Sequence, residues 1–325
     1  MKVQLRDISP GTYQPHFLHA EDNDWLESNC ATDMWIEMLH SLGLDPVAGL
    51  AFTTATGFGG DQWTMFTYPD EDLRCLYGIE VHELNVWRPL VEHVEEQISF
   101  GNLVSFDVDA FYLPDTRELT YHTTHQKTTV CAQMVDREAR RLGYFHNAAY
   151  AELGEEDFDD IFLMRADADP VAKAMPPFTD QIRLDTMSPE AATLGTVVAR
   201  LAAHLSRAGS ENPVSALAKR LQADTEWLAA HDMADFHRYA FGTCRALGAN
   251  GQLAAAFVDW LDQREGGGLG EVSASFREVS QGAKRIEFML ARVAAGRRVD
   301  IGQAMAPLEE AWAVAKETLT ARYGR

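Results

Sequence analysis

The chain has 325 residues, of which 46% are hydrophobic and 10% aromatic, an ordinary composition for a globular protein of one or two domains. Its formal net charge of −21 disfavours binding to nucleic acids and to anionic membranes, because both require local positive charge. The N-terminal stretch lacks the apolar run of a signal peptide, and no segment approaches the roughly 18 apolar residues of a membrane helix. We therefore expect a cytoplasmic protein that binds neither nucleic acid nor membrane.

The first predicted helix covers residues 29–42, where apolar side chains recur at helical spacing. Asn29 suits the N-cap position, which makes Cys30 the first helical residue. A thiol at that place lies at the positive end of the helix dipole, which favours the thiolate. Glu27 and Asp33 act in the opposite direction, so Cys30 needs a histidine partner to serve as a nucleophile. His16 and His19, earlier in the chain, are expected in a surface loop and receive no role.

Four cysteines are present and no two form a CxxC pair, which indicates reduced thiols rather than a disulfide framework. Apart from Cys30, they are expected to pack in the interior: Cys75, Cys131 and Cys244.

Residues 50–165 predict short strands, because β-branched and aromatic runs alternate with Gly, Pro, Asp and Asn. The expected strands are "AGLAFTTATGF", "DQWTMFTY", "GIEVHEL", "NLVSFDVDAFYL", "QKTTVCAQMVD" and "RLGYFHN". A helix is expected at "VWRPLVEHVEEQIS". The segment "TGFGGDQWTMF" lacks the GK[ST] ending of a phosphate loop, so it predicts a glycine-rich bend with Trp63 and Phe66 packed inside.

The last two of these strands form a predicted hairpin that carries the histidine candidates. His125 stands directly before the first strand, and the second strand ends at His146 and Asn147. Antiparallel pairing brings that end back toward His125, so Asn147 or His146 could orient the imidazole. A shift of one residue in register would exchange the two, and the sequence leaves this open. Cys30, His125 and Asn147 would then form a Cys–His–Asn arrangement. The spacing of His122 and His125 also fits a zinc site, but too weakly for a metal to be expected.

After the Pro-rich stretch "ADADPVAKAMPPFTD" the sequence becomes Ala- and Leu-rich with repeated helical spacing. Ser188 before Pro189 and Asn212 before Pro213 predict helix starts, and Gly248 and Gly266 predict helix ends. The segment "HRYAFGTCR" could line a groove or could be core plus rim. We expect an α+β domain over residues 1–170, followed by a helical bundle over residues 171–325.

The N-terminal half resembles the papain-like fold of bacteriocin-processing cysteine peptidases, and more closely the butirosin-biosynthesis type of acyltransferase. The residues that carry the resemblance are "SNCATDMWIEMLHSLG", "LVSFDVDAFYLPDT" and "YHTTHQKTTVCAQMVD". That type also carries a helical C-terminal domain. The chain further resembles a bacterial family encoded beside amino acid:carrier-protein ligases.

The resemblance implies an acyltransferase that moves an acyl or aminoacyl group from a carrier-protein phosphopantetheine thioester, through an acyl-cysteine, to a small-molecule amine or other acceptor. It implies no cofactor of the protein's own. Cys30 would be the nucleophile and His125 the base, with Asn147 in the third position, where bacteriocin-type enzymes have Asp. Asn23 or the Cys30 amide would replace the missing oxyanion-hole glutamine. The expected substrate-binding residues are Asn23, Asp107, Asp109, His122 and His146, with Asp107 or Asp109 receiving the α-amino group of an aminoacyl donor.

An acidic carrier protein needs a positive patch for docking, which Lys284, Arg285, Arg292, Arg297 and Arg298 could supply. A solvated helix face is the alternative for these residues. For the whole protein, the alternatives are a cysteine peptidase or amidase with the same residues, and a non-catalytic binding module on a degenerate papain-like scaffold.

Overall fold

The computed structural model describes residues 2–165, 171 and 174–324, and divides the chain into two compact units. Neither unit is one continuous segment. The first, which we call the α/β unit, contains residues 1–19, 30–46 and 70–191. The second, the helical unit, contains residues 20–29, 47–69 and 192–325. The predicted domain boundary falls between residues 170 and 171. Residue 170 lies outside the described residues, so this boundary stays a prediction.

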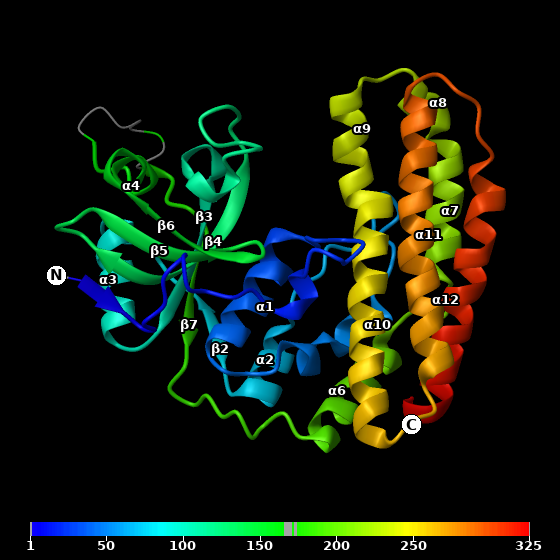
Figure 1. Ribbon diagram of the computed structural model, residues 1–325, viewed down its shortest axis with the longest axis horizontal. Coiled ribbons are helices and arrows are strands. Elements are labelled where there is room, and N and C mark those ends of the chain that lie inside the picture. Colours follow the sequence, from blue (N-terminus) through cyan, green and yellow to red (C-terminus); the bar gives the residue numbers. More distant parts are fainter. Residues whose placement is uncertain (1, 166–170, 172–173, 325) are drawn as a thin grey trace. The chain divides into compact units, whose positions relative to one another are not determined.

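The α/β unit is built on a seven-stranded sheet in which every pairing is antiparallel (Figure 1). The strand order is β2-β7-β3-β4-β5-β6, and β1 pairs with the far end of β4. The strands are β1 (Lys2–Gln4), β2 (Glu80–Glu83), β3 (Leu103–Asp109), β4 (Lys127–Asp136), β5 (Arg141–His146), β6 (Ala149–Gly154) and β7 (Thr179–Arg183).

Helices pack on both faces of this sheet, and the alternation of side chains along β4 decides which face each covers. Val130 and Ala132 join the apolar cluster that α3 (Leu90–Ser99) and α4 (Glu155–Ile161) help to form. Cys131 points to the opposite face, where its Sγ lies 3.5 Å from the Sδ of Met38 in α1 (Cys30–Ser41). The same unit holds α2 (Asp70–Tyr77) and the short 3-10 turns η1 (Phe17–His19), η3 (Ala110–Tyr112) and η4 (Pro114–Thr116).

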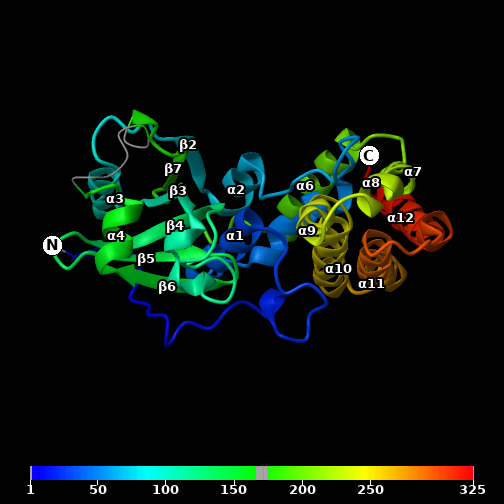
Figure 2. The ribbon, with the colours of Figure 1, turned by 90° about the horizontal axis from the view of Figure 1, so that it is seen from above.

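The helical unit contains three long helices, α10, α11 and α12, which lie side by side in Figure 1 and are seen nearly end-on in Figure 2. A π-helical turn, η5 (Phe241–Arg245), joins α9 to α10 without a break in the helix. The helices are α6 (Leu194–Arg207), α7 (Pro213–Ala223), α8 (Thr225–Ala229), α9 (Met233–Ala240), α10 (Ala246–Glu265), α11 (Gly270–Ala294) and α12 (Ile301–Tyr323).

The two early segments of the helical unit contact these helices through specific side chains. The indole Nε1 of Trp25 donates to the Ser280 hydroxyl at 3.0 Å, and its backbone exchanges two hydrogen bonds with the Gln252 side chain. Trp63 packs edge-on against Trp312, with ring centroids 5.4 Å apart. Residues 20–29 and 47–69 are therefore part of the helical core, although they precede the helices by more than a hundred residues.

The expectation of a mixed α/β region followed by an all-helical region is confirmed. The α1 and α3 helices and strands β2 to β5 lie where the sequence predicts them, and Asn212 and Gly266 cap helices as expected. The papain-like assignment of the α/β unit stays a prediction.

Two predicted strands are wrong. Residues 46–55 form the 3-10 helix η2 (Pro46–Ala55), and residues 58–66 form only an isolated bridge between Phe58 and Trp63. Both segments are apolar because they are buried in the helical unit. A short apolar run has the same pattern whether it is buried in a strand or in another kind of segment, so the sequence alone does not separate the two.

Two helix-boundary predictions are also wrong. The first helix of the helical unit begins at Leu194 with Thr193 as its N-cap, and not at Ser188. Gly248 does not end a helix but lies inside α10, where the Trp25 ring occupies the space of a Cβ atom. This glycine permits close approach of a ring rather than a change of chain direction.

Candidate functional site

Cys30 is the first residue of α1, as predicted, and its side chain is partly exposed. The other three thiols differ from it. Cys131 and Cys244 are buried, which raises the pKa of both thiols, that of Cys244 to about 12. Cys75 is also partly exposed, and its Sγ lies 3.6 Å from a carboxylate oxygen of Glu71. Cys30 stands at a helix start whereas Cys75 lies inside α2, so Cys30 has the position expected of a helix-start nucleophile.

His125 lies in the connection before β4, and its partner is Asp109, the last residue of β3. The His125 Nδ1 donates to the Asp109 Oδ2 at 2.5 Å. The other Asp109 oxygen accepts from the backbone amides of Phe111 and Gln126, at 3.0 and 3.1 Å. Three donors thus fix this carboxylate, which in turn fixes the tautomer and orientation of the His125 ring. The ring also stacks on Phe111, with centroids 4.4 Å apart.

The pair lies on a defined face of the sheet. Along β3, Val104 and Phe106 point into the apolar cluster beneath α3, so Asp107 and Asp109 point to the other face. That is the face on which α1 packs through Met38. Cys30 lies eight residues from Met38, about 12 Å along the helix axis. Among the described residues, the hydrogen-bond partners of the His125 and His146 rings do not include Cys30.

His146 is 2% exposed and takes part in a separate network. Its Nδ1 lies 2.6 Å from the Asp115 Oδ2, and its Nε2 lies 2.8 Å from the Thr128 hydroxyl. Tyr144 donates to the other Asp115 oxygen at 2.5 Å. Because both ring nitrogens of His146 have partners, this residue has no free nitrogen with which to bind substrate.

The remaining expected substrate residues are spread over different places. The His122 Nε2 lies 3.0 Å from an Asp157 oxygen. Asn147 lies in the turn between β5 and β6, with a φ of +46°. Asn23 belongs to the helical unit, in a turn closed by its amide and the Ala20 carbonyl. The partner of the His125 Nδ1 in the structure is Asp109, and not Asn147 as expected.

Asp107 is also engaged within the protein. Its Oδ1 lies 3.0 Å from the Lys127 Nζ and accepts from the Thr129 hydroxyl at 2.7 Å. Its predicted contact with an α-amino group would compete with these two partners.

The predicted docking residues lie on and after α11. Lys284 donates to the Asp24 carbonyl and lies over the Trp25 ring, and Arg285 is paired with Glu278 at 2.5 Å. These two cations are largely occupied by partners within the unit. Arg292, Arg297 and Arg298 are exposed, as is Arg285 despite its ion pair.

A buried cluster around Glu37 of α1 was missed, because His16 and His19 were expected at the surface. Glu37 is 0% exposed, and it accepts from the Tyr13 hydroxyl at 2.6 Å and from the His16 amide at 3.0 Å. The His19 side chain, 3% exposed, lies between two carboxylates, with Nδ1 against Glu37 and Nε2 3.3 Å from Asp33. The signal in the sequence was the spacing of Asp33 and Glu37, which places both on one helix face.

Burial lowers the pKa of His19, but hydrogen bonds to Asp33 and Glu37 outweigh it and raise the pKa to about 9. Burial and the charge of His40 lower the pKa of His16 to about 4. His19 is therefore a buried cation at neutral pH, which holds residues 13–19 against α1.

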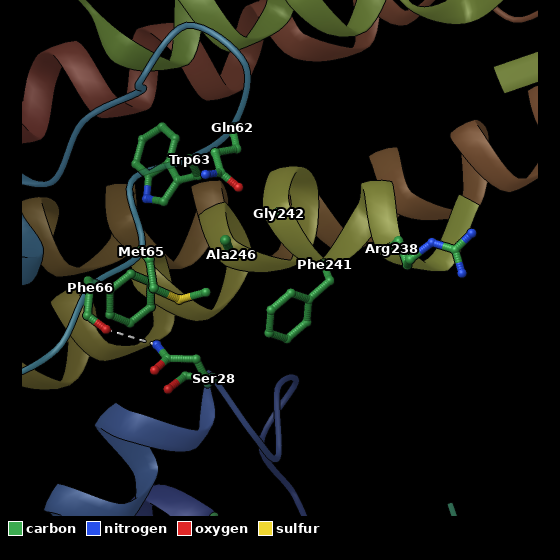
Figure 3. A pocket seen from close by; sticks show the side chains of 10 residues that line it. Ser28, Gln62, Trp63, Met65, Phe66, Arg238, Phe241, Gly242 and Ala246 are labelled. Carbon is green, nitrogen blue, oxygen red and sulfur yellow. Dashed lines mark hydrogen bonds between the residues drawn. The ribbon is translucent and has the colours of Figure 1, made fainter. Parts of the chain in front are cut away.

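The helical unit has its own pocket, of about 90 Å³, at the π-helical turn (Figure 3). Asn29 is fixed at its edge, since its Nδ2 donates to the Phe66 carbonyl at 3.0 Å. Trp63 and Phe241 contribute aromatic walls, while Arg238 extends away from the other side chains. Segments of π-helix occur often at functional sites. The prediction that "HRYAFGTCR" could line a groove agrees with this position of Arg238, Phe241 and Gly242.

The described residues contain no group of three or more His, Cys, Asp or Glu side chains placed to hold a metal ion. No helix within the described part of the chain has both the length and the apolar composition needed to cross a lipid bilayer.

The fold and these sites define a protein with two units, one α/β with a histidine–carboxylate pair and one helical with a pocket of its own. Residues 14–184 match the DUF1839 N-terminal domain, and residues 190–321 match the DUF1839 C-terminal domain. The chain belongs to the DUF1839 family. A comparison with curated proteins gave no match.

Proposed function

We propose that the protein is a cysteine acyltransferase. It would take an acyl or aminoacyl group from a carrier-protein phosphopantetheine thioester, hold it on Cys30, and pass it to an amine. The observation that supports this proposal is the His125–Asp109 pair, which lies on the sheet face against which the Cys30 helix packs. The papain-like resemblance of the sequence agrees with a nucleophile at a helix start and a base before a strand.

In the first step, His125 accepts the thiol proton as Cys30 Sγ attacks the thioester carbonyl. The bond from the carbonyl carbon to the pantetheine sulfur breaks, and His125 returns the proton to that sulfur. In the second step an amine attacks the acyl-cysteine, and its proton passes through His125 to Cys30. The first step exchanges one thioester for another of similar energy, whereas amide formation makes the second step favourable.

Asp109 is a positioning residue in this proposal. Its carboxylate holds Nδ1–H of His125 at 2.5 Å, so Nε2 is left to exchange protons with the thiol. Asp109→Asn should therefore lower the rate of Cys30 acylation by about 10²-fold, within the usual contribution of acid–base catalysis. It should also shift the pH profile of that rate, which a merely structural role would not do.

The test uses acetyl-pantetheine and alanyl-pantetheine as acyl donors, followed by intact-mass analysis. We expect a mass increase of one acyl group on the wild type and on Cys75→Ser, the matched control, and none on Cys30→Ser. His125→Ala should slow the acylation. Absence of an adduct on the wild type, or an adduct that Cys30→Ser retains, would contradict the proposal.

A non-catalytic binding module is the second candidate, and the pocket at the π-helical turn favours it. The same mass analysis separates the two candidates, because a binding module forms no acyl-Cys30. Cleavage of a peptide by the wild type, lost in Cys30→Ser, would instead indicate a cysteine peptidase.

A further inference from the structure

A second and larger pocket lies elsewhere in the helical unit. It has a volume of about 540 Å³ and is formed by the end of α6, residues 208–212 and one face of α12. We propose that this pocket binds a small monocarboxylate with an apolar body. The inference is independent of the acyltransferase proposal, since no residue given a role in that reaction lines this pocket.

The cation of this pocket is Lys316. Its Nζ donates to the Gly209 carbonyl at 3.0 Å, and no carboxylate of the described residues lies within ion-pair distance of it. Such a cation is unusual in a chain with 49 acidic and 28 basic residues. The side chain is partly buried, and this burial lowers the pKa of Lys316. A partly buried ammonium with one neutral acceptor is a favourable partner for an anion.

Trp312 lies on the same helix face, one turn before Lys316. It lines the pocket and is 1% exposed, and its indole Nε1 has no hydrogen-bond partner. A carboxylate in the pocket would pair with the ammonium of Lys316, with the Trp312 side chain beside it in the lining. Thr320, a further turn along, also lines the pocket.

The rest of the lining selects the kind of anion. Leu205, Ala208, Ala313 and Ala321 give the pocket apolar walls, and its volume is within the range typical of small-molecule sites. Glu211 and Glu317 are also among the lining residues, and they repel anions of high charge such as phosphates. A singly charged carboxylate with a short aliphatic or aromatic body fits both features.

The experiment compares 4-phenylbutyrate with the neutral 4-phenylbutan-1-ol by isothermal titration calorimetry on the full chain. We expect the carboxylate to bind at least tenfold more tightly. Lys316→Met should abolish this preference while keeping the aliphatic stem, and Lys219→Met, which removes an exposed lysine of α7, should retain it. In NMR spectra, the Trp312 indole N–H signal, identified by its absence in Trp312→Phe, should shift when the carboxylate is added.

Equal affinity of the two compounds for the wild type would overturn the proposal, as would absence of saturable binding. This comparison needs no variant, so it decides even if a substitution impairs folding. An equal loss of preference in Lys219→Met would also overturn it, because the effect would then come from net charge alone. Inorganic phosphate serves as a third probe, and binding as tight as that of the carboxylate would contradict the monocarboxylate assignment.

Discussion

The residue with the most unusual surroundings is His19, whose two ring nitrogens each meet a buried carboxylate. Two carboxylates and one imidazolium leave the trio with a net charge of −1, while a neutral imidazole would face one carboxylate without a proton to donate. The folded protein is therefore more stable with His19 protonated than with His19 neutral. Folding and protonation of His19 are coupled through this difference.

This coupling predicts that stability decreases on the alkaline side. The pKa of His19 is about 9 in the folded protein and 6.5 as an unperturbed group. Its contribution is complete below pH 6.5 and is lost as the pH rises through 9. A difference of this size corresponds to roughly 3 kcal/mol. Urea unfolding at pH 6.5 and pH 9 should show the loss in the wild type and a smaller loss in His19→Gln.

His82→Gln is the matched control, because His82 is exposed and is paired with Glu80 at the surface. The control should behave like the wild type. Equal pH dependence of the wild type and His19→Gln would show that His19 does not carry the effect.

At the scale of elements, glycine determines how closely α10 approaches its neighbours. Gly248 lies against the Trp25 ring, and Gly251 lies against the backbone of α11 at Phe276 and Ser280. A Cβ atom at either place would collide with a group that cannot move easily. The cost of two glycines in a helix interior is therefore offset by packing.

Gly248→Ala tests this packing. Alanine has the higher helix propensity, by about 1 kcal/mol, yet we expect a loss of about 1–3 kcal/mol because the core is overpacked. Gly270→Ala, at the open start of α11, is the control and should be neutral or stabilising. Urea unfolding monitored by circular dichroism measures both. A more stable Gly248→Ala variant would contradict the steric account.

Elements with strong periodicity were predictable from the sequence. The α1 helix, the β4–β5 hairpin and the position of His125 before β4 follow from local patterns. The Asp109 partner of His125 did not, because it depends on the pairing of β3 with β4, which juxtaposes Asp109 and Lys127. The burial of His16 and His19 could not be predicted from the residues beside them, because it depends on their contacts with Glu37 of α1. Strand β6 was missed because it follows the His146–Asn147 turn without a strong apolar alternation.

For the whole molecule, the family boundaries and the compact units differ. The C-terminal family match begins at residue 190, whereas the helical unit also requires residues 20–29 and 47–69. These early segments supply Trp25, with its bond to Ser280, and Trp63, with its contact to Trp312. Nothing in the sequence of these loop segments indicates to which of the two units they belong.

We therefore predict that a fragment of residues 190–325 unfolds at a lower temperature than the helical unit in the full chain. Removal of two buried tryptophans costs about 3–5 kcal/mol each when a core cannot collapse. Thermal melting followed by circular dichroism should show the loss, and the fragment should bind the dye ANS. Addition of residues 1–189 as a separate chain is the control and should restore part of the stability. A fragment as stable as the full chain would disprove this dependence.

The discontinuous units have a consequence for synthesis on the ribosome. Residues 47–69 emerge early, but the helices that this segment packs against begin only at residue 194, with α6, whose His204 contacts Phe52. At typical elongation rates of about 5–20 residues per second, this segment waits roughly 6–25 s for its first helix. During that interval the nascent chain presents uncovered aromatic surface, so translation speed and chaperone binding should determine how much of the protein reaches its native form.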